Sequence, residues 1–235
     1  MGVPRRFVAP NDCLNCSLRQ KGDFCHLPDH LLESFNLTGH LTLYPAGAML
    51  LREGQIPRGV YIICSGRAKL SLEARDNKTV ILKIADRRQL IGLSAIVSNR
   101  PSPMTVTTLE TSQVKYIERD SFLSLLQQDA RALLTCATMI AQEVVGSFDD
   151  VHELLMARSS TEKLARLLLS WVAGETHNQE LRVAANFTHE EIAQMIGSSR
   201  ETVTRLFSDM RRKELIRLEG STLVIPNRVA LQALA

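Results

Sequence analysis

Long apolar runs are missing from this 235-residue sequence. No stretch of about 18 consecutive apolar residues occurs, so the chain is not predicted to span a membrane. Residues 1–7 also lack the apolar core of an export signal. We therefore expect a cytoplasmic protein with no membrane partner.

Signatures of catalysis are absent as well. The sequence contains no Walker phosphate-binding loop, no His-Glu-x-x-His zinc motif and no recognisable Ser/His/Asp set. Charge is nearly balanced, with 28 Lys and Arg against 25 Asp and Glu, so net charge does not indicate a partner. Aromatic residues are scarce at 5%, but the charged content of 23% is ordinary for a globular protein. We expect a non-enzymatic protein of two domains.

Two helix starts lie close together near the C-terminus. Thr188 is followed three residues later by Glu191, and Ser198 by Glu201, so each pair has the spacing of a capping box. Gly197 separates the two expected helices, and apolar residues recur on both at helical spacing. The segment is therefore predicted to be a helix-turn-helix.

The second of these helices carries side chains suited to reading DNA. In a helix-turn-helix its first residues lie against base edges in the major groove, and here they include Arg200 and Glu201. Arg can donate two hydrogen bonds to guanine, and Glu can accept one from cytosine. The alternative interpretation is an ordinary helical hairpin with a solvated polar face. The predicted DNA contacts are Thr188, Ser199, Arg200, Glu201, Thr202, Thr204, Arg205, Arg211 and Arg212.

A short hairpin is expected after this helix. The β-type segments 215–218 and 222–225 are joined through Gly220, which can supply the positive φ of a tight turn. A hairpin in this place is a wing. Residues 198–203, Arg205 and the wing together resemble the DNA-binding domain of the Crp/Fnr family of bacterial transcription regulators. The resemblance implies a homodimer that binds a double-stranded DNA operator and contacts RNA polymerase.

Short β-type segments dominate residues 41–117. They are punctuated by glycines, as expected of a jelly roll or barrel, and residues 76–78 are predicted to form a hairpin turn. The glycine spacing resembles the cyclic-nucleotide-binding β-roll of the same family. Each Gly can equally serve a turn without touching a ligand.

The chain departs from the cyclic AMP receptor branch in the β-roll and matches it in the recognition helix. That branch has a Glu after the Gly at the position of Gly92 and, further on, an Arg-Ser pair; this chain has Leu93-Ser94 and Pro103-Met104. A cyclic phosphate without an Arg partner would lose its charge-assisted bidentate contact, so we expect no cyclic AMP binding. In the recognition helix, Arg200-Glu201 followed by Arg205 matches that branch and implies a TGTGA-like half-site.

Three cysteines lie close together near the N-terminus. Cys13 and Cys16 form a Cys-x2-Cys pair, and Cys25 follows. Two thiolates at this spacing can hold one metal ion from a single turn, and the third could join them. The arrangement is similar to the iron–sulfur segment of the Fnr branch, although Lys115 stands where that branch has its fourth Cys. His26, Cys64 or Cys136 could substitute.

The chemistry of these cysteines is left open between three interpretations. An odd number of five Cys argues against a disulfide framework. The alternatives are a metal site, either an iron–sulfur cluster or zinc, held by Cys13, Cys16 and Cys25; a redox thiol; or an inert remnant. A thiol oxidoreductase would need the pair at a helix start in a thioredoxin-like βαβ unit, and no such unit is recognisable.

Helical periodicity begins near residue 121. Apolar positions then alternate in spacings of four and three, which makes a heptad seam. Such a helix is expected to pair in parallel with that of a second copy, the alternative being a helix packed only on its own β-roll. The predicted dimer interface is Leu133, Ala137, Ile140, Val144, Val151 and Leu154.

A further capping box at residues 159–162 marks a domain boundary. We predict an α+β protein with a Cys-containing segment (1–28), a double-stranded β-helix or jelly-roll sensory domain (29–128), a dimerisation helix (129–158) and a winged helix-turn-helix domain (159–235). The predicted function is sequence-specific transcription regulation in response to an unidentified signal, with redox or oxygen sensing as one candidate. The alternatives are a thiol oxidoreductase and an effector-free architectural DNA-binding protein.

Overall fold

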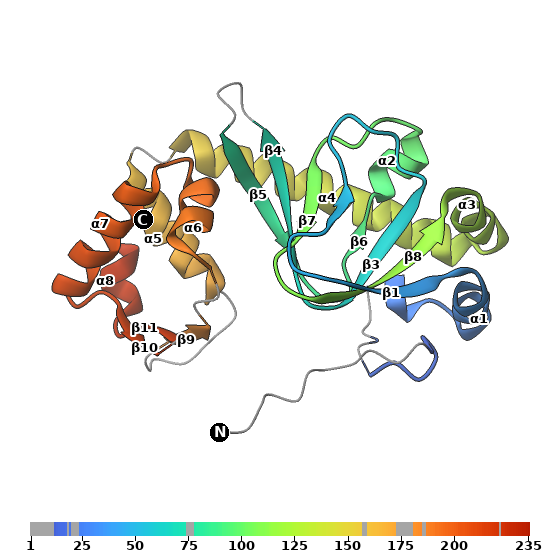
Figure 1. The fold of residues 1–235 in the computed structure, drawn as a ribbon, viewed down its shortest axis with the longest axis horizontal. Coiled ribbons are helices and arrows are strands. Elements are labelled where there is room, and N and C mark those ends of the chain that lie inside the picture. Colours follow the sequence, from blue (N-terminus) through green and yellow to red (C-terminus); the bar gives the residue numbers. More distant parts are fainter. Residues whose placement is uncertain are drawn as a thin grey trace. The chain divides into compact units, whose positions relative to one another are not determined.

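The computed structural model describes residues 12–17, 19, 24–73, 78–156, 159–172, 181–184, 187–220 and 222–235, with the side chains of 149–156 excepted. The chain divides into two compact units (Figure 1). Unit 1 comprises Met1–Leu72 and Leu82–Val145, and unit 2 comprises Glu73–Ile81 and Gly146–Ala235.

Unit 1 is built on two four-stranded sheets. The first has the order β1-β8-β3-β6 and the second β2-β7-β4-β5. The strands are β1 His40–Tyr44, β2 Met49–Leu51, β3 Gly59–Ser65, β4 Ala68–Glu73, β5 Thr79–Ala85, β6 Leu90–Ile91, β7 Thr105–Thr108 and β8 Ser112–Glu118. Buried side chains from both sheets meet in one cluster, which includes Leu51, Ile63, Val106 and Val114. The predicted jelly roll is confirmed.

The first sheet is covered on its other face by helices. Side chains alternate along a strand, so Val60 and Ile62 of β3 face away from Ile63 and join a second cluster with Phe35 and Phe122. This cluster is formed with the short helix η1 Phe24–His26, α1 Asp29–Thr38, α2 Leu93–Ser98 and α3 Arg119–Gln128. Because both faces of the sheet are apolar, β3 reads as an almost continuous hydrophobic run.

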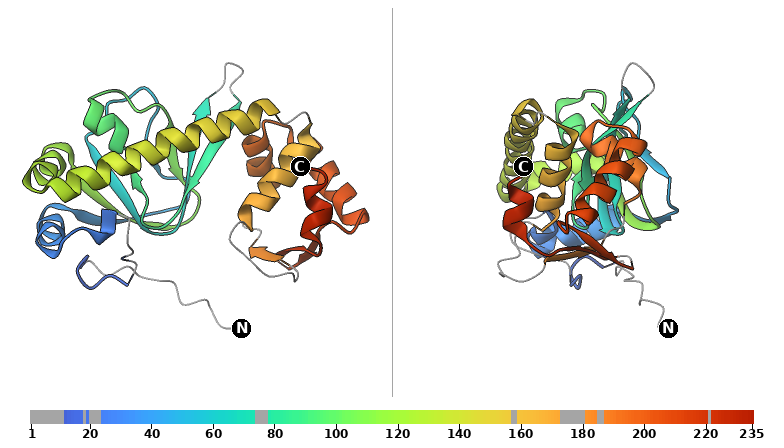
Figure 2. Two further views of the ribbon diagram at one scale, coloured as in Figure 1. Left: turned by 180° about the vertical axis from the view of Figure 1, so that it is seen from behind. Right: turned by 90° about the vertical axis from the view of Figure 1, so that its left-hand side faces the viewer.

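The long helix α4, Ala130–Met156, begins in unit 1 and runs into unit 2. Figure 2 shows it from the side opposite to Figure 1. Helical periodicity from residue 121 was predicted, but the chain breaks it at Asp129, which has extended backbone (φ −143°, ψ 121°) between α3 and α4. The Asp129 carboxylate accepts a hydrogen bond from Arg131 N (2.6 Å), as a helix-capping side chain does.

The two faces of α4 have different surroundings. Cys136 is buried and Ile140 is partly buried against the core of unit 1. Leu133, Val144 and Phe148 are 56%, 50% and 71% exposed. Among the predicted dimer residues, Leu133, Ala137 and Val144 therefore lie on the open face, and Ile140 packs inward. The side chains of Val151 and Leu154 lie outside the described residues.

Unit 2 contains a helical core with a small sheet. Its elements after α4 are α5 Ser160–Trp171, β9 Leu181–Ala184, α6 His189–Ile196, α7 Arg200–Arg212, β10 Arg217–Glu219, β11 Thr222–Ile225 and α8 Arg228–Gln232. The sheet has the antiparallel order β10-β11-β9. Leu168, Ile192, Val203 and Phe207 are among the side chains that pack in its core. The predicted helix-turn-helix and wing are both present.

Some predictions fall on residues that the structure does not describe. They are part of the turn at 76–78 and Ser221 of the wing. Within the described ranges, no helix is both long enough and apolar enough to cross a membrane.

Candidate functional site

The first helix of the motif begins as predicted. Thr188 Oγ1 accepts a hydrogen bond from Glu191 N (3.2 Å), and Thr188 N donates to the Glu191 carboxylate (2.7 Å). These reciprocal bonds are a capping box. Gly197 ends the helix at a φ of 62°, a left-handed conformation that favours glycine.

The predicted cap of the second helix is wrong by one residue. Ser199, rather than Ser198, is the N-cap of α7, and its Oγ accepts from Thr202 N (3.2 Å). Ser198 still belongs to the end of α6, because its backbone N–H donates to Ala193 O (2.9 Å) in the left-handed turn at Gly197. The Ser198 hydroxyl lies 3.3 Å from that of Ser160 in α5.

Helix α7 presents most of the predicted DNA contacts on one face. Arg200, Glu201, Thr204 and Arg205 are exposed, as are Arg211 and Arg212 one to two turns further on. The opposite face is fixed in the core by Val203, Phe207 and Met210. Thr202 is the exception among the helix contacts, since it is partly buried with its hydroxyl 3.0 Å from Ser199 Oγ. Arg212 forms an ion pair with Asp209 (2.8 Å).

An open hollow of about 390 Å³ lies where the two helices of the motif begin. Thr188, His189, Glu190 and Arg200 line it. Two of these residues, His189 and Glu190, were not predicted as site residues. Arg200 is the lining residue that can pair with a phosphate group, whereas the Glu190 carboxylate opposes an anion there.

His189 connects the two helices of the motif. Its Nδ1 lies 2.9 Å from Thr204 Oγ1, and its ring is stacked on Phe207 with centroids 4.9 Å apart. The spacing of 15 residues between His189 and Thr204 crosses the turn, so helical periodicity could not reveal the pair. The one sequence feature that could have indicated His189 is its position directly after the N-cap residue Thr188, at the start of the first helix of the motif.

The wing carries a charge network. Glu219 of β10 pairs with Arg217 of the same strand (2.9 Å) and with Arg182 of β9, on the other side of β11 (2.8 Å). The pKa of the Glu219 carboxyl lies below its ordinary value, chiefly because of the hydrogen bond from Arg217. The carboxylate thereby holds one guanidinium group from each outer strand of the sheet.

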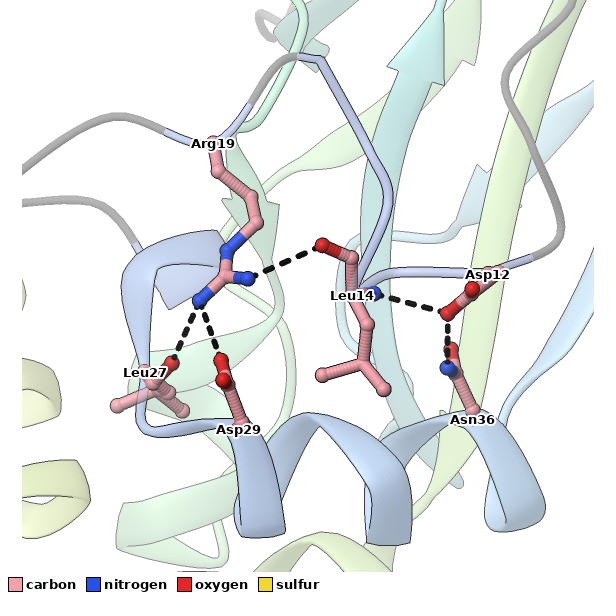
Figure 3. A network of polar contacts seen from close by, with 6 residues as sticks. All are labelled: Asp12, Leu14, Arg19, Leu27, Asp29 and Asn36. Atoms are coloured by element: carbon pink, nitrogen blue, oxygen red, sulfur yellow. Dashed lines mark hydrogen bonds and ion pairs between the residues drawn. The ribbon is translucent and has the colours of Figure 1, made fainter.

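The N-terminal cysteine segment is attached to α1 of unit 1 through polar contacts. Figure 3 shows Asp12 accepting hydrogen bonds from Leu14 N (2.9 Å) and Asn36 Nδ2 (2.8 Å). In the same view, Arg19 donates to the carbonyl of Leu14 (3.1 Å) and pairs with Asp29 (2.9 Å). Both ends of the Cys13–Cys16 region are therefore held against the same helix.

Lys115 lies beneath this segment. It is only 2% exposed, and its Nζ donates to Cys13 Sγ (3.3 Å) and Asn36 Oδ1 (2.9 Å). Asn36 Oδ1 also accepts from Cys13 N (2.9 Å), and the ring of Phe35 lies 5.3 Å from Lys115 Nζ. Gly39 leaves room for the Lys115 chain, since a Cβ there would lie 2.7 Å from Lys115 Cε.

Burial raises the pKa values of two thiols near Lys115. It raises the pKa of Cys64 to about 12, with further contributions from Cys13 and Cys16. Burial also raises the pKa of Cys13, and the nearby Lys115 ammonium opposes that rise. At neutral pH both thiols are expected to be protonated.

The residues around Cys13 do not fit a metal ion in this arrangement. In the part of the chain that the structure describes, no three His, Cys, Asp or Glu side chains are grouped to hold one. The Lys115 ammonium is bonded to Cys13 Sγ, and a cation at that sulfur opposes a second cation. The metal site of Cys13, Cys16 and Cys25 stays a prediction.

Two family models match the sequence. One, described as a cyclic nucleotide-binding domain, matches residues 41–129, and the other, a Crp-like helix-turn-helix domain, matches residues 162–234. The first match covers most of the β-roll of unit 1, and the second covers α5 through α8 of unit 2.

Curated relatives resemble the chain over most of its length. The CRP-like cAMP-activated global transcriptional regulator of Mycobacterium tuberculosis is 27% identical over 183 residues, or 77% of this chain and 82% of that protein. The cAMP-activated global transcriptional regulator CRP of Salmonella typhimurium is 25% identical over 201 residues, or 84% of this chain and 94% of that protein.

Solved structures share the fold. The c-di-GMP responsive global regulator CLP of Xanthomonas campestris has a TM-score of 0.72 at 19% identity, covering 85% of this chain and all of that chain. FixK2 from Bradyrhizobium japonicum has a TM-score of 0.71 at 20% identity, covering 83% and 96%. At these identities the likeness concerns the fold alone.

Proposed function

We propose, because the chain belongs to the Crp/Fnr family of transcription regulators, that it works as a homodimer that reads an inverted-repeat operator. Its helix-turn-helix is a DNA-binding domain, and regulators of this family are not enzymes. Contact with RNA polymerase, which is typical of the family, is part of the proposal.

The observation that carries this proposal is the exposed face of α7. Arg200, Glu201, Thr204 and Arg205 are side by side on a helix fixed by the Ser199 cap and by three buried side chains. A fixed helix loses little conformational freedom on binding. Arg200 and Arg205 can each bind guanine, and Glu201 can accept from cytosine, which suits a TGTGA-like half-site.

Selection of binding sites from random DNA with the full-length protein tests this proposal. We expect an inverted repeat with half-sites about 10 base pairs apart or a multiple of that spacing. Arg200→Ala should weaken binding by about 1–3 kcal/mol and relax the preference at one G·C pair. Arg211→Ala is the matched control, because a phosphate contact should weaken all sequences alike and reduce the salt dependence. Motifs without two-fold symmetry would contradict the assignment.

We propose further that cyclic AMP is not the effector of this chain, although the M. tuberculosis and S. typhimurium relatives are cAMP-activated. The residue after Gly92 is Leu93, which is buried in the apolar core and offers no carboxylate to a ribose. At the place of the Arg-Ser pair stand Pro103 and Met104, whose side chains cannot pair with a phosphate. In calorimetry with cyclic AMP we expect no tight binding; a micromolar dissociation constant coupled to DNA affinity would refute this.

We place the signal input at the cysteine segment. The support is that Cys13, Cys16 and Cys64 lie near one another and near Lys115 in unit 1. A redox or oxygen signal could alter the hydrogen bond between Lys115 and Cys13 and so the docking of the segment.

Metal content and the visible spectrum of protein purified without air test the predicted iron–sulfur cluster or zinc; a colourless, metal-free product excludes both. If DNA binding by Cys13→Ser responds to air as that of the unchanged protein does, Cys13 is excluded as the input.

A further inference from the structure

The hydrogen of the Thr204 hydroxyl group is used within the protein itself. Thr204 Oγ1 donates to Arg200 O, one turn earlier in α7, at 2.9 Å. On its other side it meets His189 Nδ1 of α6, also at 2.9 Å. Thr204 is nevertheless exposed, between Arg200 and Arg205 on the face that carries the DNA contacts.

This arrangement limits what Thr204 can offer to DNA to its methyl group and one acceptor lone pair of its oxygen. A Thr hydroxyl has a single hydrogen, and in either histidine tautomer that hydrogen is used by Arg200 O or by His189 Nδ1. Thr204 therefore cannot donate to a base edge without breaking an internal bond. The group on Cβ that has no internal hydrogen bond is the methyl.

We infer that Thr204 reads a thymine through its methyl group and that His189 is the positioning residue that holds it in this orientation. In the major groove, thymine differs from cytosine by its C5-methyl group, which a Thr methyl can contact. The inference rests on the proposed reading of DNA by α7 and assigns a base to the helix position between its two Arg residues.

His189 suits the positioning role because it is itself fixed. Its ring is half-buried and stacked on Phe207, at an interplanar angle of 28°. Phe207 is 6% exposed and belongs to the core of unit 2. In a helix a Thr side chain divides between two rotamers, both able to bond to the backbone, so a second partner is needed to select one. His189 is that partner.

Deoxyuridine in place of thymidine tests the inference, because deoxyuridine lacks only the methyl group. Each thymidine of the selected operator is replaced in turn, and the dissociation constant of the full-length protein is measured. We expect about fourfold weaker binding when one particular thymidine of each half-site is replaced, because burial of one methyl group stabilises a complex by about that factor.

Variants of Thr204 then assign that penalty to a side chain. Thr204→Ser keeps the hydroxyl and loses the methyl, so the penalty should disappear. Thr204→Val keeps the methyl and loses the hydroxyl, so the penalty should remain. Ser208→Ala is the matched control, since Ser208 lies one turn further along the exposed face with its hydroxyl bonded to Thr204 O (3.0 Å); it should leave the penalty unchanged.

Variants of His189 test the positioning role. His189→Ala should reduce the penalty to about twofold, because Thr204 regains its second rotamer. His189→Asn, whose side-chain amide can donate or accept a hydrogen bond, should restore the penalty. A merely structural role for His189 would weaken binding to both DNAs equally and would leave their ratio unchanged.

The outcomes separate this inference from the proposed function. Failure of the full-length protein to select any sequence would overturn the proposed function and the inference with it. Sequence-specific binding without a deoxyuridine penalty would overturn the inference alone. So would a penalty that persists in Thr204→Ser or vanishes in Thr204→Val, since the methyl would then be read by another side chain, or the hydroxyl would be the reading group.

Discussion

At the scale of single residues, Lys115 has the most unusual surroundings. Its ammonium is buried with a thiol and an amide oxygen as its hydrogen-bond partners. A buried ammonium loses its hydration, and neither Cys13 nor Asn36 brings a formal negative charge while Cys13 is protonated. The chain of Lys115 also fills space beside Phe35 and Gly39. Its volume and its charge are therefore expected to act on stability in opposite directions.

Two substitutions at Lys115 separate volume from charge. Lys115→Ala should lower the free energy of unfolding of unit 1 by about 2–4 kcal/mol, as expected when a large buried side chain is removed. Lys115→Met should lower it much less, because the volume is kept and the desolvated charge is removed. Urea unfolding measures both. The exposed Lys83→Ala is the control and should change stability little. Equal losses in Lys115→Ala and Lys115→Met would mean that the ammonium itself stabilises the unit.

The contact between Lys115 and Cys13 could not be predicted from the sequence. Lys115 was recognised only as a residue in place of a fourth cysteine. Its contact with Cys13 joins residues 102 positions apart, and a separation of that length leaves no local pattern. The pair between His189 and Thr204 was missed for the same reason.

At the scale of elements, the N-terminal end of the recognition helix depends on one serine. Ser199→Ala should lower the free energy of unfolding of unit 2 by about 1 kcal/mol, because Thr202 N loses its cap. Ser198→Ala is the matched control and should have a smaller effect, since the Ser198 hydroxyl caps no helix. Thermal unfolding of the two variants compares them. A larger loss in Ser198→Ala would mean that the contact with Ser160 outweighs the cap.

The elements that the sequence predicted correctly are those specified by local rules. The capping box of Thr188 and Glu191, the strand β3 and the wing follow from spacing and turn residues within a few positions of one another. The predicted cap at Ser198 was wrong because Ser198 belongs to the end of the preceding helix. Its backbone N–H donates to Ala193 O in the turn at Gly197. Apolar periodicity continues on both sides of Asp129 and gives no sign of the break there, although the predicted boundary between residues 128 and 129 lies at the same place.

At the scale of the whole molecule, a single copy of the chain leaves large apolar side chains of α4 exposed to solvent. Leu133, Val144 and Phe148 are at least half exposed, on a helix whose opposite face is buried against unit 1. A second copy of the helix would cover these side chains in a parallel pair. Such burial stabilises association by about 25 cal/mol for each Å² of apolar surface removed from water.

The dimer is tested by charges placed on this face. The double variant Val144→Asp, Phe148→Asp should sediment as a monomer and lose affinity for the inverted repeat, because only two linked helices α7 can occupy both half-sites. Ile140→Asp does not serve this purpose, since Ile140 packs on the core of unit 1 and a carboxylate there should unfold it. Leu37→Asp is the matched control: Leu37 is 85% exposed on α1, and its variant should remain dimeric. A double variant that is folded and still dimeric would show that the seam of α4 is not the interface, and the two recognition helices would then need another surface to set their spacing on DNA.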